Sequence, residues 1–344
     1  MAISDYQLIE AWKAVLTLSK LERGQTVTIL TSASTHPQTL QCATIATQSM
    51  GAIVNRLDLP PVNGEKAFSR DSLSYLGTTP LTGNRAAIAA LKESDLVLDL
   101  MTLLFSPEQH DILKSGTKIL LAVEPPEVLA RMVPTQADKT RVLAAAAKLG
   151  AAREMRVTSP AGTSLVCPMG EFGPTAEYGF VDEPGRWDHW PSGFALSYPN
   201  DHTAHGTIVI DRGDILLPQK RYVTEPIVLT VEKGYATRIE GGVDAALLRD
   251  YMETFRDPEG YAISHIGWGL QPRARWSTLG LYDREATIGM DARAFEGNFL
   301  FSLGPNNEGG GSRTTTCHID IPLRNCTVML DDAVMVKDGR VVNE

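Results

Sequence analysis

The first 150 residues alternate helix-like and strand-like segments, and this alternation constrains the fold more than any other feature of the chain. Residues 26–30 predict a buried strand, and further strands are predicted at 53–59, 96–100 and 118–123. Helical spacing of apolar or alanine residues predicts helices at 8–18, 39–50, 85–91, 107–113 and 126–149, the last broken near Pro134. Strands that alternate with helices of this length form a mostly parallel sheet. We therefore expect an open, Rossmann-like α/β domain over residues 1–152.

No GxGxxG or Walker-type glycine pattern follows any of these strands, so a nucleotide-binding function of this half is unsupported. After about residue 153 the pattern becomes β-rich. Residues 207–210 and 215–217 predict one hairpin, and 226–232 and 235–240 predict another with its turn at Lys233-Gly234. A single helix is predicted at 244–255. We expect a second, β-rich α+β domain over residues 153–344, which holds five of the seven histidines.

The charge pattern excludes several kinds of partner. The net charge is −9 and no run of Lys or Arg occurs, so nucleic acids and anionic membranes are not expected to bind. No apolar stretch reaches the length of a membrane span, and no basic segment leads into an apolar one near the N-terminus. The four cysteines are scattered without CxxC spacing, which is typical of reduced thiols, and we expect a cytoplasmic protein.

The segment Thr316–Ile321 carries the strongest chemical signal. In a strand, His318 and Asp320 point to the same face, while Cys317 points to the other. Two histidines and one carboxylate with open positions opposite form the usual site of non-haem Fe(II) oxygenases, and His265 can supply the second histidine. Chance alone supplies about one His-x-acid pair in a chain of this composition, so a plain hydrogen-bonded pair is the alternative.

Two further segments are candidates for binding. His265 lies among glycines in Ser264–Leu270, where small residues allow a backbone to approach closely; a turn histidine beside packing glycines is the alternative. The segment from Glu171 through Glu177 to His189 and Trp190 predicts a pocket wall in a loop, or else a surface loop held by its tryptophans. Arg293, Ser302 and Asn306 could hydrogen-bond a substrate.

The remaining histidines, serines and cysteines give weaker evidence for a functional site. His202 and His205 are three residues apart, and we expect an exposed turn rather than a second metal site. No GxSxG pattern occurs, and none of the cysteines has the local signature of a catalytic thiol.

At these residues the chain resembles the 2,5-dihydroxypyridine 5,6-dioxygenases, ring-cleaving enzymes of bacterial nicotinic acid and nicotine degradation. The resemblance covers essentially the whole chain and is carried by HIGWGL at 265–270, GRWDHWPSG at 185–193 and HID at 318–320. The β-rich half more distantly resembles metallopeptidases of the leucyl aminopeptidase T type, through the His-x-Asp strand and the VEKGY…IEGG hairpin at 231–242.

The resemblance implies one Fe(II) ion per chain, held by His265, His318 and Asp320. It implies a small N-heteroaromatic substrate that O₂ converts to N-formylmaleamate. Glu177 and His189 are the implied catalytic and substrate-binding residues. Arg293 and Ser302 are implied substrate contacts.

Phe105 departs from what the resemblance implies. It follows the strand predicted at 96–100, at the carboxyl end where open α/β sheets bind ligands. A histidine that accepts the substrate's proton is expected there, and phenylalanine cannot transfer protons. Either another group is the acid/base, or the chain is a low-activity variant; alternatively, Phe105 simply packs beneath the helix that begins at Pro107.

Two rival functions remain open at this point. A two-metal aminopeptidase would need extra carboxylates, for which Glu171 and Glu177 are the nearby candidates. A metal-free binding protein could keep the same pocket. Exposed sheet edges in such folds favour a symmetric homo-oligomer.

Overall fold

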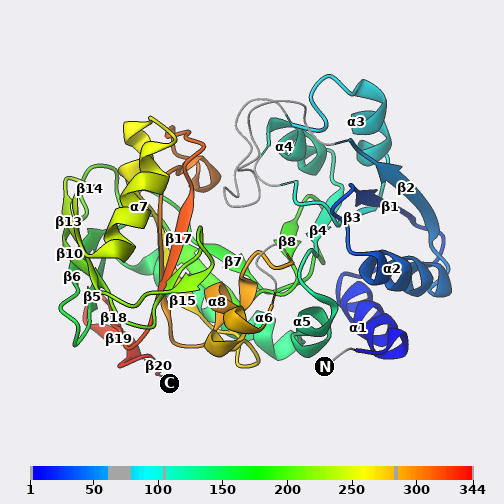
Figure 1. The fold of residues 1–344 in the computed structure, drawn as a ribbon. Helices are drawn as coiled ribbons and strands as arrows, with labels where there is room; N and C mark the ends of the chain where they lie inside the picture. The colour runs from blue at the N-terminus through cyan, green and yellow to red at the C-terminus, as the bar shows by residue number, and fades with distance from the viewer. Residues whose placement is uncertain (1–2, 61–78, 104–105, 283–285, 343–344) are drawn as a thin grey trace. The chain divides into compact units, whose positions relative to one another are not determined.

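The computed structural model describes residues 3–60, 79–103, 106–282 and 286–342, which divide into two compact units (Figure 1). Unit 1 comprises Met1–Lys139, Glu177–Ser192 and Asp283–Met290; unit 2 comprises Thr140–Ala176, Gly193–Tyr282 and Asp291–Glu344. Residues 177–192 of unit 1 contribute a strand to its sheet. The single domain boundary at residue 152 stays a prediction.

Unit 1 is built on a five-stranded parallel sheet with strand order β2-β1-β3-β4-β8. The strands are β1 (Thr26–Thr31), β2 (Ile53–Asp58), β3 (Leu96–Asp99), β4 (Lys118–Leu121) and β8 (Trp187–His189). The first four agree with the prediction, whereas the loop predicted around His189 is wrong for the residues of β8. Its three residues are too short and too polar to read as a strand, and they become one only by pairing with β4, with His189 opposite Leu121.

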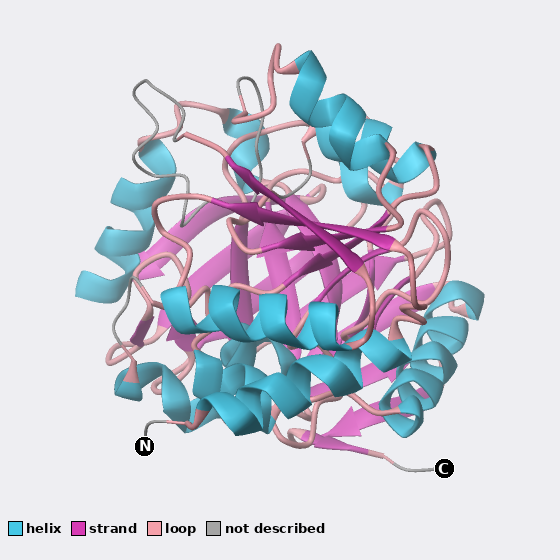
Figure 2. Cartoon of the chain, turned by 90° about the vertical axis from the view of Figure 1, so that its right-hand side faces the viewer, coloured by secondary structure: helices cyan, strands magenta, loops and turns pink. Residues whose placement is uncertain are grey.

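Helices cover both faces of this sheet (Figures 1 and 2). They are α1 (Asp5–Leu18), α2 (Pro37–Ser49), α3 (Arg85–Lys92), α4 (Pro107–Lys114) and α5 (Pro126–Arg131). The first, second and fifth pack together on one side, and α3 and α4 on the other. Ser4 starts α1 with a capping box, and the buried stripe of this helix includes Trp12, which meets Trp190 edge to face at 4.9 Å.

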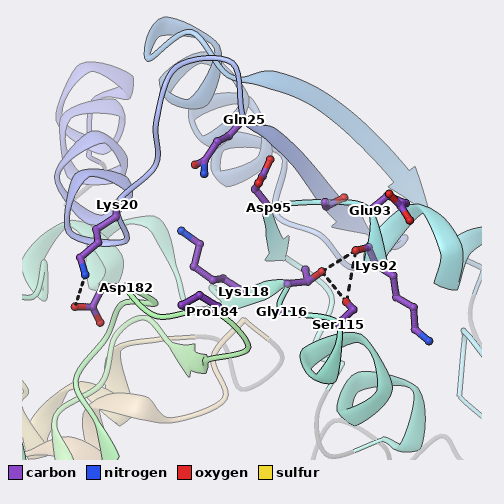
Figure 3. A pocket seen from close by; sticks show the side chains of 12 residues that line it. Lys20, Gln25, Lys92, Glu93, Asp95, Ser115, Gly116, Lys118, Asp182 and Pro184 are labelled. Carbon is purple, nitrogen blue, oxygen red and sulfur yellow. Dashed lines mark hydrogen bonds and ion pairs between the residues drawn. The ribbon is translucent and has the colours of Figure 1, made fainter.

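A polar recess of about 440 Å³ lies at the amino ends of β3 and β4 (Figure 3). Its lining includes Lys118, a buried lysine whose Nζ donates to the carbonyl oxygen of Ser19 at 2.8 Å. Ser19 is the C-cap of α1, where a cation also interacts favourably with the helix dipole. Burial lowers the pKa of Lys118. Open α/β sheets bind ligands at the carboxyl ends of their strands, whereas this recess lies at the amino ends. The hydrogen bond of Lys118 to Ser19 connects α1 to the sheet.

Unit 2 contains an eight-stranded antiparallel sheet with the order β14-β13-β10-β6-β5-β18-β19-β20. Its strands are β5 (Glu154–Thr158), β6 (Ser164–Pro168), β10 (His205–Ile210), β13 (Ile227–Glu232), β14 (Tyr235–Gly241), β18 (Thr327–Leu330), β19 (Ala333–Lys337) and β20 (Arg340–Val341). The hairpin predicted at Lys233-Gly234 is confirmed as β13–β14. Both turn residues have positive φ, 49° and 79°, as a two-residue hairpin turn requires.

The other predicted hairpin is wrong. The strand β10 pairs with β13 and β6, and β11 (Ile215–Leu216) pairs instead with β12 (Arg221–Tyr222). In the eight-stranded sheet β10 pairs with β13 over residues 206–210 and with β6 over residues 205–207, and the turn at Asp211–Asp214 leads the chain out of this sheet. Backbone hydrogen bonds from Gly213 to Val223 and from Val223 to Asp214 hold the new pair.

A further five-stranded sheet has the order β17-β16-β15-β9-β7. Its strands are β7 (Thr175–Glu177), β9 (Phe194–Ser197), β15 (Ile263–Gly269), β16 (Phe299–Leu303) and β17 (Ile319–Leu323). Every residue of β9, β15, β16 and β17 is buried, so both faces of this sheet are covered. The close approach expected beside the glycines is confirmed, since a Cβ on Gly267 would lie 2.0 Å from the carbonyl oxygen of Ala195.

The remaining helical elements range in length from 16 residues to three. They are α6 (Gln136–Ala151), α7 (Val243–Glu253), α8 (Met290–Ala294) and the 3₁₀ turns η1 (Pro258–Tyr261), η2 (Trp276–Leu281) and η3 (Asn307–Gly309). The break predicted near Pro134 is confirmed, because α5 ends at Arg131 and α6 begins at Gln136. Among the described residues, none of the helices combines the length and the apolar character that crossing a membrane requires.

Candidate metal centre

Three strands of the buried sheet bring His265, His318 and Asp320 together. His265 lies on β15, Asp320 on β17, and His318 immediately precedes β17. The strand between them, β16, pairs with both, placing Ser302 opposite Asp320. The side chains of the three residues are 4–5 % exposed. His265 and His318 are 53 positions apart in sequence. They meet in one buried site because β15 and β17 both pair with β16.

The three facing atoms form a nearly equilateral triangle. His265 Nε2 lies 2.9 Å from Asp320 Oδ1 and 3.3 Å from His318 Nε2. His318 Nε2 lies 3.2 Å from the same carboxylate oxygen. Two ligand atoms at about 2.1 Å from a metal and at right angles to each other are about 3.0 Å apart. The residues therefore fit one face of an octahedral metal site.

The second oxygen of Asp320 is held by Arg293, on α8. Arg293 Nε donates to Asp320 Oδ2 at 2.5 Å, which leaves Oδ1 turned to the two histidines. Burial alone would raise the pKa of Asp320, but Arg293 and the two imidazoles outweigh it and hold that pKa well below its usual range. Burial would likewise lower the pKa of His318, yet the carboxylate of Asp320 raises it. The site thus presents an ionised carboxylate ready to bind a cation.

Ser302 supports His265 through the backbone. The pairing of β15 with β16 shifts register between Ile263 and Ile266, and His265 lies in this bulge. Its amide donates to Ser302 Oγ at 2.9 Å, and the Ser302 hydroxyl donates to the His265 carbonyl at 3.3 Å. A bulge redirects a side chain at the cost of ladder hydrogen bonds, which the serine here replaces.

A second group of ionisable side chains lies in unit 1. His189 Nε2 is 2.5 Å from Glu177 Oε2, and its Nδ1 is 2.6 Å from the carbonyl oxygen of Pro191. A carbonyl can only accept, so Nδ1 carries a proton, and a second proton is shared between Nε2 and Glu177. Burial alone would lower the pKa of His189, but Glu177 raises it above its ordinary value.

Asp188 adjoins this pair but suits a structural role. Its carboxylate accepts from the backbone amides of Tyr178, Gly179 and His189 and from the Arg186 guanidinium, at 2.7–3.2 Å. Four donors occupy both oxygens, so a metal there would have to displace several hydrogen bonds. Burial raises the pKa of Asp188. Glu177 and His189 therefore form a proton-sharing pair rather than part of a metal cluster.

The other residues singled out from the sequence have these positions. Phe105 lies outside the described residues. The exposed turn expected at His202 and His205 is confirmed for His202, which stacks on Tyr235, whereas the exposed His205 is the first residue of strand β10. Glu171 is exposed and accepts from the Asp201 amide. Its side chain is not part of the three-membered group around Asp320, which has no further carboxylate ligand among the described residues.

Sequence reasoning missed the side chains that stabilise the loop before β17. Arg313 donates from Nε to the Gly304 carbonyl and from Nη2 to the Ile263 carbonyl, and Asn306 accepts from its backbone amide. Tyr198 and Glu308, which lie near the histidines, were also missed. No local pattern signals these contacts, because the partners are 7–110 positions apart in the sequence.

The chain is similar to known proteins over nearly its full length. Residues 7–343 match the family model described as 2,5-dihydroxypyridine 5,6-dioxygenase. The protein of that name from Pseudomonas putida KT2440 is 55 % identical over 342 residues, covering 99 % of this chain and 98 % of that one. A solved structure of the dioxygenase from the same organism has 54 % identity and a TM-score of 0.96 and covers 100 % and 99 % of the two chains. AmpT from Thermus thermophilus shares the fold at a TM-score of 0.61 with 15 % identity, covering 98 % and 99 %.

Proposed function

The chain belongs to the 2,5-dihydroxypyridine 5,6-dioxygenase family, and we propose that it opens the ring of 2,5-dihydroxypyridine with O₂ at one Fe(II) ion. The ion would be held by His265, His318 and Asp320. The triangle of their facing atoms, with edges of 2.9–3.3 Å, carries the proposal. Two neutral imidazoles and one carboxylate on a single face are typical of non-haem Fe(II) oxygenases. The product would be N-formylmaleamate, which contains both atoms of O₂.

An Fe(II) ion bound there would lower the pKa of a coordinated substrate hydroxyl and supply an electron for the activation of O₂. The protein side chains would prepare the site for it. Arg293 keeps Asp320 ionised and fixes which of its oxygens faces the histidines. Ser302 holds the backbone of His265. Both remain predicted substrate contacts, which the Arg293 Nη groups and the Ser302 hydroxyl would make.

Glu177 and His189 remain the predicted catalytic and substrate-binding pair. A buried carboxylate and imidazole that share a proton can both accept a hydrogen bond from a polar heterocycle and donate one to it. Phenylalanine at position 105 cannot accept the hydroxyl proton of the substrate. Among the residues that the structure describes, Glu177 and His189 are best suited to accept it. This role is tested by Glu177→Gln, which keeps the shape of the side chain but cannot take up the proton. We expect kcat to fall more than KM rises.

The central experiment is anaerobic loading with Fe(II), followed by oxygen uptake with 2,5-dihydroxypyridine. One iron per chain, one O₂ consumed per substrate, and a product that gains both atoms of ¹⁸O₂ are expected. His265→Ala should abolish iron retention and oxygen uptake. The matched control is His202→Ala, since His202 is an exposed histidine of the same unit. Two divalent ions per chain with oxygen-independent peptide cleavage would refute the proposal in favour of an aminopeptidase.

A further inference from the structure

The carboxylate of Glu308 lies between Tyr198 and His318. Its Oε1 is 3.9 Å from His318 Nδ1, and its Oε2 accepts from the Tyr198 hydroxyl at 3.2 Å. The other ring nitrogen of His318, Nε2, faces His265 and Asp320. The two nitrogens of this imidazole therefore face opposite sides, one towards the triangle of facing atoms and the other towards Glu308.

The fold fixes the position of Glu308. The residue belongs to η3, and the next residue, Gly309, packs so closely on the Tyr198 ring that a Cβ there would lie 2.4 Å from Cδ2. The Tyr198 ring in turn meets the His265 imidazole edge to face at 6.2 Å. Arg313 secures the same loop through the Gly304 carbonyl. Tyr198 and Glu308 thus link the surroundings of both histidines, and the Glu308 side chain is 17 % exposed.

We propose that Glu308 is a positioning residue of the metal centre, which fixes the tautomer of His318. A neutral imidazole can bind a metal only through the nitrogen that lacks a proton, and the group facing the other nitrogen decides which one that is. A carboxylate beside Nδ1 favours a proton there and leaves the Nε2 lone pair directed at the triangle. At 3.9 Å the contact is electrostatic rather than a hydrogen bond. Tyr198 binds Oε2 and so keeps Oε1 turned to His318.

This inference rests on the proposed metal site and is tested through metal affinity. Glu308→Gln keeps the size of the side chain and an acceptor for Tyr198 but removes the charge. We expect the affinity for Fe(II), measured anaerobically by competition with a chelator, to fall about 10- to 100-fold. The absorption spectrum of the Co(II)-loaded protein should also change. Glu259→Gln is the control, because Glu259 accepts from the Tyr235 hydroxyl as Glu308 does from Tyr198.

The inference and the proposed function fail on different outcomes. Wild-type metal affinity in Glu308→Gln, or an equal loss in Glu259→Gln, overturns the inference, as does a lower melting temperature without a change in affinity. Should Glu308→Gln fail to fold, Tyr198→Phe serves instead, and several-fold weaker binding is expected. If His318→Ala loses the metal while Glu308→Gln does not, the proposed function stands and only the positioning role fails. If His318→Ala also keeps wild-type affinity, the proposed function fails.

Discussion

Replacing Arg293 with methionine tests whether the charge of Asp320 depends on this one partner. Arg293 is 6 % exposed and Asp320 is 4 % exposed, so the ion pair is buried on both sides. Methionine keeps much of the volume but leaves the carboxylate without its guanidinium. Removing one partner of a buried pair typically costs about 3–5 kcal/mol, because the remaining charge stays buried.

This loss is large enough to measure by thermal unfolding after metal removal. An unfolding entropy of about 2.1 cal/mol/K per residue gives about 0.7 kcal/mol/K for 344 residues, so the melting temperature should fall by about 4–7 °C. Arg293→Lys keeps the charge but not the planar donor geometry, so a smaller fall is expected. The melting temperature is expected to fall, and not to rise, because the pKa of Asp320 is lower in the folded protein than in the unfolded chain. The ionised carboxylate therefore stabilises the fold at pH values above its unfolded pKa of about 3.9.

The matched control is Arg141→Met in the same unit. Arg141 Nη1 lies 3.0 Å from Glu296 Oε1, but the two side chains are 31 % and 34 % exposed. Such a solvent-screened pair contributes about 0–1 kcal/mol, which corresponds to a shift of less than about 2 °C. Equal shifts in Arg293→Met and Arg141→Met would refute the reasoning, since burial of the pair would then have no energetic consequence.

Three further predictions concern other parts of the chain. Phe105→His should raise the rate of oxygen uptake at least about tenfold, and unchanged turnover with intact anaerobic substrate binding would count against a base at that position. Burial raises the pKa of Asp99 to about 6, so its stabilising contribution is complete below about pH 3.8 and is lost as the pH rises through 6. In urea unfolding, the advantage of wild type over Asp99→Asn should therefore shrink by up to about 3 kcal/mol between pH 4 and 7, and a constant difference would contradict it. Gly267→Ala should lower both stability and metal retention because its Cβ meets the Ala195 carbonyl, whereas Gly280→Ala, with its nearest neighbour at 3.6 Å, should not.

The first four strands of unit 1 were predictable because each is a short segment of mainly β-branched and leucine residues between two helical segments. The fifth strand was not, because β8 contains Asp188 and His189, whose polar groups are satisfied only in the fold. Asp188 depends on the Tyr178 and Gly179 amides, and His189 depends on Glu177. Local polarity therefore favoured a loop until tertiary partners were in place.

The triangle formed by His265, His318 and Asp320 was predictable only in part from sequence spacing. The spacing of His318 and Asp320 is local and follows from the alternation of a strand. Which other histidine joins them is decided by sheet order, and the sequence pattern alone does not place β16 between β15 and β17. Arg293 and Ser302 were expected to contact the substrate, and that expectation stays a prediction. In the structure Arg293 donates to the Asp320 carboxylate and Ser302 accepts from the His265 amide, a role that no spacing in the sequence signals.

The register of β16 against β17 joins the requirements of folding to those of the site. Ser302 lies opposite Asp320 and Leu303 opposite Ile319. Because side chains alternate faces, a slip of one residue would turn Asp320 away from Arg293 and bring Ile319 into its place. That register would leave a buried carboxylate without a partner, a loss of several kcal/mol, in addition to the lost packing of a fully buried isoleucine. Arg293 therefore disfavours the shifted pairing of β16 and β17 even without a metal ion. The ion pair of Arg293 and Asp320 thus both sets the charge of the site and favours the strand register that brings its residues together.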